Sequence, residues 1–305
     1  MKVGINILNF GYGASPNSIE RWARFAEETG YHFVMMSDHV AVTPDVQALY
    51  VAPFYDALIS LAWIAGITKR VEIGATVLIV PYRHPLLTAR LVANLDQLSG
   101  GRFILGVGAG WAKQEFEALG IPFHRRGAIT DDYLKAIKIC LTNEIAGYEG
   151  EFVSFKDVHT GPPPARLPHP PIWVGGSTEA ALRRAVRYGD AWHPIRIRVD
   201  WLTEKGLPML RQVAEAEGKP VPALCPRIIL RLTDSPLEES KRVAGQGTID
   251  QIRKDLVDLE SLGTQYLLLD TYISEPEDTR DRERHLAMFE VLAERVLDLD
   301  RQTVL

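Results

Sequence analysis

The chain has 305 residues, of which 46% are hydrophobic and 24% charged, and its formal net charge is -5. This is enough apolar sequence for a sizeable core, and the acidic balance argues against nucleic acid or an anionic membrane as the main partner. The first residues, MKVGINILNF, carry no charged leader and no long apolar segment, so we expect a cytoplasmic protein. Cys140 and Cys225 lie far apart without metal-ligand spacing, which predicts free thiols and no bound metal.

Predicted strands and helices alternate along the whole chain. Apolar, β-branched runs predict eight strands, at 3–8, 33–36, 71–77, 103–107, 172–174, 190–192, 227–232 and 266–269. A helix is expected after each strand, beginning near Ser18, Pro53, Pro85, Ile129, Thr178, Val199, Thr248 and Arg280. This alternation favours an α/β fold of the (β/α)8 TIM-barrel type, with 1–305 as a single domain.

Barrels of this type have about 250 residues, so the remainder is expected in insertions at the mouth formed by the carboxyl ends of the strands. The candidate insertions are 108–127 and 148–171, and the second resembles a small hairpin followed by a proline-rich connector. An open doubly wound sheet is the alternative fold. It is disfavoured because the glycines after the first strand, Gly11 and Gly13, lack the third glycine and the helix placement of a dinucleotide-binding fingerprint.

The unit formed by the third strand, the next helix and the fourth strand has unusual residues at both strand ends. The helix from Pro85 carries leucines at 87, 91, 95 and 98, which are expected to form one apolar stripe. The fourth strand ends in GVGAGW, where Gly108 and Ala109 let the backbone approach a ligand closely. Trp111 is then either a stacking surface for a flat cofactor or a loop anchor.

A second glycine-rich turn follows the fifth predicted strand. Gly175, Gly176, Ser177 and Thr178 precede a helix, so their amides can face an anion with the helix dipole behind them. The alternative is that Ser177 or Thr178 only caps the helix. Arg183, Arg184 and Arg187, on that helix, form either a solvated face or an attraction for further negative charge on a ligand.

Three ionisable residues are candidates for chemistry. His39, at the end of the second strand, could act as a general acid or base, with Asp38 orienting it or closing the rim. Because adjacent residues on a strand end tend to point in opposite directions, we favour His39 as the one facing a ligand. Glu115 is either functional or an acid in an early helical turn.

Four segments in order resemble the bacterial-luciferase-like flavin-dependent superfamily, and most closely its branch that uses the deazaflavin coenzyme F420. They are SDH at 37–39, the block at 73–111, EFEALGIPFHRRG and PHPPIWVGGSTEAALRRAVRYGDAW. The resemblance implies a barrel, often homodimeric, that binds the ring across its mouth near Asp38 and His39. It implies a non-prolyl cis peptide at Thr76–Val77 behind the ring, phosphate at Gly175 and Gly176, and basic side chains such as Arg183 along the coenzyme tail.

One departure from the family pattern bears on the substrate. Sugar-phosphate dehydrogenases of the F420 branch carry a glutamate directly after the glycine-rich end of strand four, where this chain has Trp111. Sugar-phosphate oxidation is therefore in doubt, and Glu115 is the candidate replacement acid.

The principal hypothesis is an oxidoreductase that moves a hydride between coenzyme F420 and a small organic substrate. The alternatives are a two-component monooxygenase that uses reduced FMN, and a barrel that binds a flavin without turnover. A metal-dependent barrel hydrolase is least favoured, because the chain has no HExxH motif or paired-carboxylate spacing.

Overall fold

A parallel sheet forms the centre of the protein. The computed structural model describes residues 1–305. Its central strands are β1 (Lys2–Ile7), β2 (Phe33–Met36), β3 (Glu72–Ala75), β4 (Leu78–Ile79), β5 (Phe103–Gly108), β8 (Ile172–Gly175), β9 (Ala191–His193), β10 (Ala223–Leu224), β11 (Arg227–Ile229) and β14 (Tyr266–Asp270). They follow the order β10-β9-β8-β5-β3-β2-β1-β14-β11, with β4 beside β5. The prediction of an α/β fold is confirmed.

The predicted seventh strand, at 227–232, is broken into shorter pieces. Pro226, which has no N–H group, separates β10 from β11, and β12 (Arg231–Leu232) pairs with β13 (Gln246–Gly247) outside the main sheet. β10 pairs with β9, whereas β11 pairs with β14. In addition, the amide of Gln265 donates to the carbonyl of Leu224 (3.0 Å), and the amide of Arg227 donates to Pro194 (2.8 Å). Both ends of the strand path therefore lie in one segment, 223–229.

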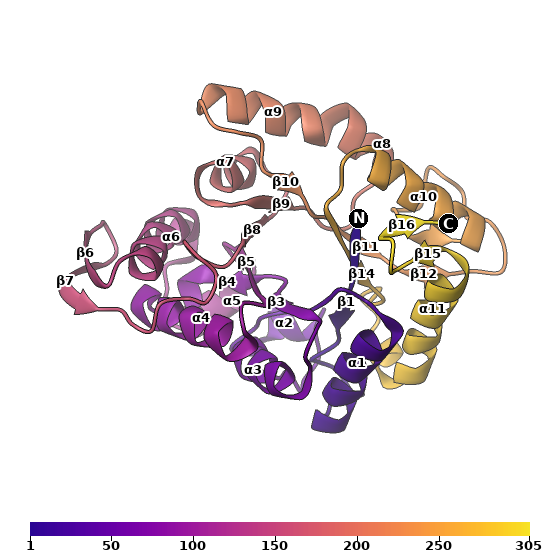
Figure 1. The fold of residues 1–305 in the computed structure, drawn as a ribbon, viewed down its shortest axis with the longest axis horizontal. Coiled ribbons are helices and arrows are strands. Elements are labelled where there is room, and N and C mark those ends of the chain that lie inside the picture. The colour runs from indigo at the N-terminus through magenta and orange to yellow at the C-terminus, as the bar shows by residue number, and fades with distance from the viewer.

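Helices cover the outside of the strands (Figure 1). The long ones are α1 (Pro16–Thr29), α3 (Ala57–Ile67), α4 (Pro85–Ser99), α6 (Arg126–Thr142), α7 (Glu179–Tyr188), α9 (Leu207–Ala216), α10 (Ile249–Ser261) and α11 (Arg282–Arg295). The helix expected from Pro53 begins four residues later, at Ala57, because the Asp56 carboxylate caps it by accepting from the amide of Ile59. None of the helices has the length and apolar character that a membrane span requires.

Short elements complete the chain. They are α2 (Pro44–Gln47), η1 (Val80–Tyr82), α5 (Lys113–Ala118), η2 (Phe123–Arg125), β6 (Ile145–Glu149), β7 (Ser154–His159), α8 (Val199–Trp201), η3 (Leu202–Gly206), η4 (Pro276–Arg280), β15 (Leu297–Asp298) and β16 (Thr303–Val304). The predicted hairpin is present as β6 and β7, which pair antiparallel and project from the body of the protein (Figure 1). The expectation that all insertions lie at the mouth is wrong for this hairpin. It connects the end of α6 to the start of β8, which is the opposite end of the sheet.

The predicted leucine stripe of α4 does not form a buried face. Leu95 is buried, but Leu87 and Leu98 are 51% and 71% exposed. Smaller residues, Thr88 and Ala89 among them, occupy the buried face instead. The leucines were expected inside because they are the larger apolar residues, yet a helix that packs closely on a sheet can use its small residues for contact.

Glycines at the end of β5 make room for the irregular end of strand three. The Thr76–Val77 peptide is cis, as the resemblance implies, and it separates β3 from β4. A Cβ on Gly106 would lie 1.9 Å from the carbonyl oxygen of Ala75, and one on Gly108 would lie 2.6 Å from Cγ2 of Val77. These two glycines are therefore required by protein packing, in addition to any ligand approach.

A buried polar network lies between the strands just below the mouth. His193 on β9 is fully buried, and its Nδ1 faces the carbonyl of Cys225 while its Nε2 lies 2.8 Å from the hydroxyl of Thr76. Since a carbonyl can only accept, Nδ1 carries the proton and Nε2 accepts from Thr76. Burial, with a smaller contribution from the charge of Arg227, lowers the pKa of His193 to about 4.

The neutral state of His193 predicts an acid-dependent loss of stability. Its pKa in the folded protein, about 4, lies below the value of 6.5 for an exposed histidine, so the unfolded chain binds more protons between these values. The contribution of His193 to the free energy of unfolding is therefore fully present above pH 6.5, and it falls by up to about 3 kcal/mol as the pH drops to 4. His193→Asn should flatten the dependence of the unfolding free energy on pH in this window, as measured by urea denaturation.

His159→Asn is the matched control, because His159 is exposed on β7. It should keep the wild-type slope. A wild-type slope in His193→Asn as well would contradict the assignment of a neutral, buried His193.

Candidate active site

A cavity of about 330 Å³ opens at the carboxyl ends of the strands. Most of the residues predicted from the sequence line it, namely Asp38, His39, Thr76, Val77, Gly108, Ala109, Trp111, Gly175, Gly176 and Thr178. Glu115, Ser177 and Arg183 do not line it. The parallel strand ends bring together residues that are more than 130 positions apart in the sequence, from Asp38 to Gly176.

His39 is held by a buried carboxylate. Its Nδ1 lies 2.6 Å from Oε2 of Glu115, which is fully buried on α5. Because Nδ1 is engaged by an acceptor, it carries a proton, and Nε2 is left as the ring nitrogen available to the cavity. This arrangement, in which a buried carboxylate fixes the tautomer and orientation of an imidazole, is the one that general acid and base catalysis uses.

Glu115 also binds three other groups at the mouth. Its carboxylate accepts from the amides of Val40 (2.6 Å) and Ala41 (2.9 Å) and from the hydroxyl of Tyr82 (2.8 Å). Burial by itself would raise the pKa of Glu115, but the donors from His39, Ala41 and Tyr82 outweigh it and hold the pKa below its usual value. Glu115 is therefore an ionised positioning group behind His39. It does not reach the cavity, where a replacement acid would have to lie.

Asp38 points to a different partner. Its two oxygens accept from the Arg83 guanidinium, both at 2.8 Å, and Oδ2 also accepts from the amide of Ile79 at 2.9 Å. Arg83 reaches Asp56 as well, at 3.0 Å. The Asp38 carboxylate is thus neutralised, and it ties the end of β2 to β4 and to the loop before α3. This geometry supports the alternative in which Asp38 closes the rim and does not orient His39.

The opposite end of the cavity is positively charged. Arg126 and Arg184 line it next to Gly175, Gly176 and Thr178. The Arg184 side chain is 7% exposed and pairs with Asp131 at 2.7 Å, while Arg126 donates to the carbonyls of Gly110 and Phe123. Two fixed guanidinium groups beside a glycine turn at a helix start are suited to bind a phosphate or another anion.

The glycine turn itself is held by two hydrogen bonds. The indole of the buried Trp192 donates to the carbonyl of Gly176 at 2.7 Å, and Gly176 has a φ of +108°, which favours glycine. The Thr178 hydroxyl caps α7 by accepting from the amide of Ala181. The capping role proposed for Ser177 or Thr178 therefore belongs to Thr178, and it leaves the earlier amides of the turn available.

Of the helix arginines, Arg184 lines the cavity and Arg183 does not. Arg183 lies on the outer side of α7, where it pairs with Glu179 (2.5 Å) and Glu217 (3.6 Å). The sequence places both arginines on one helix and offers no local signal that separates them.

Three aromatic rings lie close to the His39 ring. The centroids of Tyr50, Phe54 and Trp111 lie 5.3–5.7 Å from that of His39. Trp111 meets the imidazole edge to face, at an interplanar angle of 80°, and is 42% exposed. This end of the cavity is therefore apolar, with the His39 ring as its polar group.

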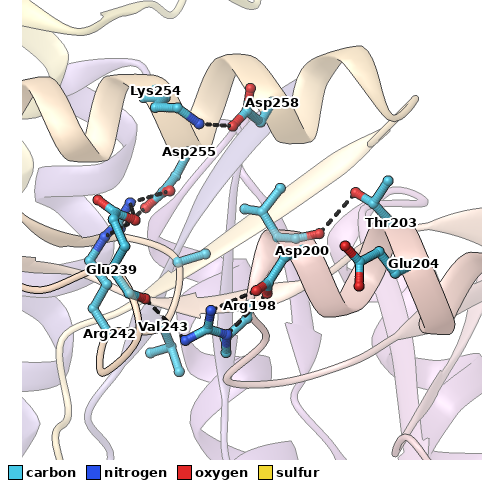
Figure 2. Close-up of a pocket in the computed structure, with 12 residues that line it drawn as sticks. Arg198, Asp200, Thr203, Glu204, Glu239, Arg242, Val243, Lys254, Asp255 and Asp258 are labelled. Carbon is cyan, nitrogen blue, oxygen red and sulfur yellow. Dashed lines mark hydrogen bonds and ion pairs between the residues drawn. The ribbon is translucent and has the colours of Figure 1, made fainter.

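A second cavity, of about 360 Å³, lies between α8 and α10 (Figure 2). Its cations are all paired: Arg198 with Asp200, Arg242 with Asp255 in a two-bond arrangement of 2.5 and 2.9 Å, and Lys254 with Asp258. The Arg242–Asp255 pair ties 238–244 to α10. None of the site residues predicted from the sequence lines this cavity.

Arg126 and Arg227 are lining cations that the sequence did not point to. Arg126 lies inside the segments that resemble the superfamily, but it follows the end of β5 by 18 residues, so its position gives no signal of proximity. Arg227 starts β11, and an arginine in a buried strand was a signal that could have been noticed.

The chain is similar in sequence to known enzymes. The profile described as luciferase-like monooxygenase matches residues 1–243. An F420-dependent glucose-6-phosphate dehydrogenase of Kineococcus radiotolerans is 33% identical over 222 residues, which cover 70% of this chain and 64% of that protein. An FMNH2-dependent dimethylsulfone monooxygenase of Pseudomonas putida is 36% identical over 129 residues, 41% of this chain and 35% of that protein.

Among solved structures, the monooxygenase RslO1 of Streptomyces bottropensis superposes with a TM-score of 0.76 at 23% identity, covering 96% of this chain and 98% of that one. This similarity shows a shared fold. Similar proteins thus depend on either F420 or reduced FMN. Because the profile covers most of the chain, the protein belongs to the luciferase-like monooxygenase family.

Proposed function

We propose that the protein is an F420-dependent oxidoreductase that acts on a small organic substrate at the mouth cavity. The observation that carries this proposal is the His39–Glu115 pair, which presents one imidazole nitrogen to a cavity with an anion site at its far end. The F420-dependent relative matches a larger share of the chain than the FMNH2-dependent one, which favours the deazaflavin.

The cavity residues suit such a coenzyme. Thr76, Val77, Gly108 and Gly175 line the cavity, and none of them carries a charge that would meet a flat ring. Arg126 and Arg184 would hold the phosphate together with the turn at Gly175 and Gly176. When bound, the coenzyme would supply the hydride-exchanging carbon.

His39 would handle the proton of the substrate. For an alcohol substrate, Nε2 would accept the hydroxyl proton as the carbon loses a hydride, and it would return that proton in the reverse reaction. Glu115 would stabilise the resulting imidazolium through Nδ1. The aromatic wall of Tyr50 and Trp111 would exclude water from the reacting atoms.

Reduced FMN is the second candidate, since the same anion site suits its phosphate. Oxygen activation would then replace simple hydride exchange. A third candidate is a barrel that binds a flavin without turnover, which stoichiometric binding with no hydride exchange would support.

Coenzyme binding tests the proposal. We expect F420 to bind one per chain, more tightly than FMN, in fluorescence titration. Arg184→Met should weaken binding about 10- to 100-fold, because it removes a charge-assisted contact to phosphate. Arg183→Met is the matched control and should bind like wild type. Tight FMN binding without F420 binding would reject the deazaflavin, and equal losses in both variants would reject the assignment of Arg184.

Hydride exchange tests the role of His39. His39→Asn should lower the rate of F420 reduction by simple secondary alcohols by about 10²- to 10⁴-fold while coenzyme binding persists. Glu115→Gln should lower the rate at least tenfold while coenzyme binding persists, because the carboxylate that orients the His39 ring through Nδ1 is gone. A wild-type rate in Glu115→Gln would contradict its positioning role.

We further propose that the sheet is a closed (β/α)8 barrel and that 1–305 is one domain. Support comes from 223–229, which hydrogen-bonds to β9 on one side and to β14 on the other. The helices outside the strands agree with this reading.

We also propose that the protein is a homodimer joined through α3 and α4. The outer stripe of α3 consists of Ile59, Ala62, Trp63 and Gly66, and Leu87 is exposed on the neighbouring α4. Asp56 lies at one end of α3, and Lys69 and Arg70 lie at the other, so a twofold antiparallel pairing matches opposite charges. Contiguous exposed apolar residues of this kind are typical of a protein interface.

Sedimentation velocity tests the dimer. The wild type should sediment as a dimer at micromolar concentration, and Ile59→Lys, at a side chain that is 75% exposed, should shift it to the monomer. Val257→Lys, on the exposed side of α10, is the matched control and should stay dimeric. A monomeric wild type would refute the proposal.

A further inference from the structure

Arg227 is a buried cation beside the mouth cavity to which the proposed reaction gives no role. It is 8% exposed and lines the cavity together with Thr76 and Val77. Its Nε and Nη2 donate to Oδ2 of Asp270 at 3.0 and 2.6 Å, and its Nη1 donates to the carbonyl oxygen of Thr76 at 3.1 Å. A buried ion pair adds little stability over apolar residues of the same size, so stability alone is a weak reason for its presence.

The groups around Arg227 have a fixed hydrogen-bond direction. Nη1 of Arg227 also lies 3.3 Å from the Thr76 hydroxyl, which donates to Nε2 of the neutral His193. Asn6 donates to Oδ1 of Asp270, as does the amide of Tyr272. The guanidinium and the Asp270 carboxylate are therefore the charges of this network, and its other members are neutral.

The charge balance of hydride transfer gives Arg227 a role. A hydride carries two electrons and one proton, so its arrival adds one negative charge to whatever accepts it. In a cavity with little water, a nearby cation stabilises such an added charge more strongly than it would in solvent. Arg227 is the cation on the Thr76–Val77 side of the cavity, whereas Arg126 and Arg184 flank the glycine turn.

On the basis of the proposed function, we propose that Arg227 stabilises the more negative, reduced form of the bound coenzyme. Asp270 limits this effect because its carboxylate partly neutralises the Arg227 guanidinium. Arg227 is an electrostatic and positioning residue in this scheme. Proton transfer stays with His39.

The two-electron reduction potential of the bound coenzyme, measured by equilibration with a reference dye, tests the proposal. Arg227→Gln should lower the potential, because it removes the cation and leaves the Asp270 carboxylate uncompensated. Asp270→Asn should raise it, because the cation is then uncompensated. We expect at least a tenfold change in the relative affinity for the reduced and oxidised forms, which corresponds to about 30 mV for two electrons.

Two further variants separate charge from packing. His193→Asn replaces a neutral member of the network that does not line the cavity and keeps both charges, so the potential should stay at the wild-type value. Arg227→Lys keeps the charge but loses the two-bond contact, and its potential should lie closer to wild type than that of Arg227→Gln. If Asp270→Asn fails to fold, this comparison of Lys and Gln at position 227 decides the matter.

Shifts of the reduction potential in opposite directions in Arg227→Gln and Asp270→Asn support the proposal. A loss of packing alone would not move the potential in opposite directions in the two variants. Shifts in the same direction, or an unchanged potential in Arg227→Gln with coenzyme still bound, would overturn it. A wild type that binds neither F420 nor FMN would overturn the proposed function itself, and binding is measured before the potential.

Discussion

The mouth of this protein depends on one buried carboxylate, that of Glu115. It receives four donors from two segments of chain: the His39 ring and the next two amides in one, and the Tyr82 hydroxyl in the other. A fully buried carboxylate is tolerated only when its oxygens are satisfied in this way. Through these bonds, α5 fixes the ends of the second and third strands relative to the fourth, and the orientation of His39 follows from them.

The other charged side chains at the mouth are either paired with an opposite charge or grouped at one place. Asp38 and Asp270 are neutralised by Arg83 and Arg227, so no free acid faces the cavity on the side of Thr76 and Val77. Arg126 and Arg184 concentrate positive charge next to the glycine turn. The cavity thus has an apolar end with one imidazole and a cationic end with backbone amides. This polarity matches a ligand that is flat and neutral at one end and anionic at the other.

Much of the fold could be predicted from the sequence because periodicity and capping residues are local signals. The cap at Thr178, the proline start of α4 and the helix after Thr248 all appear where expected. The break of the predicted strand 227–232 into β11 and β12, and the outward leucines of α4, were missed, since they depend on which neighbours each element meets. Strand ends also identified most of the cavity residues.

The remaining errors in the site have a common physical cause. Sequence order places a residue on an element but does not say which of two neighbours points inward. Arg183 was preferred to Arg184 on this account, although both lie on α7 and only Arg184 lines the cavity. Glu115 was expected to replace the acid that is missing at Trp111. Its four hydrogen-bond donors instead hold its carboxylate inside the protein, away from the cavity. The cis peptide at Thr76–Val77 was anticipated by resemblance, because no periodicity encodes it.

A crystal structure with the coenzyme bound tests the central claim most directly. The account predicts the ring against Thr76 and Val77, with its reacting edge within hydrogen-bond reach of a substrate held by Nε2 of His39 and its phosphate at Gly176 and Arg184. A ring bound elsewhere, or a phosphate at the cavity between α8 and α10, would contradict it.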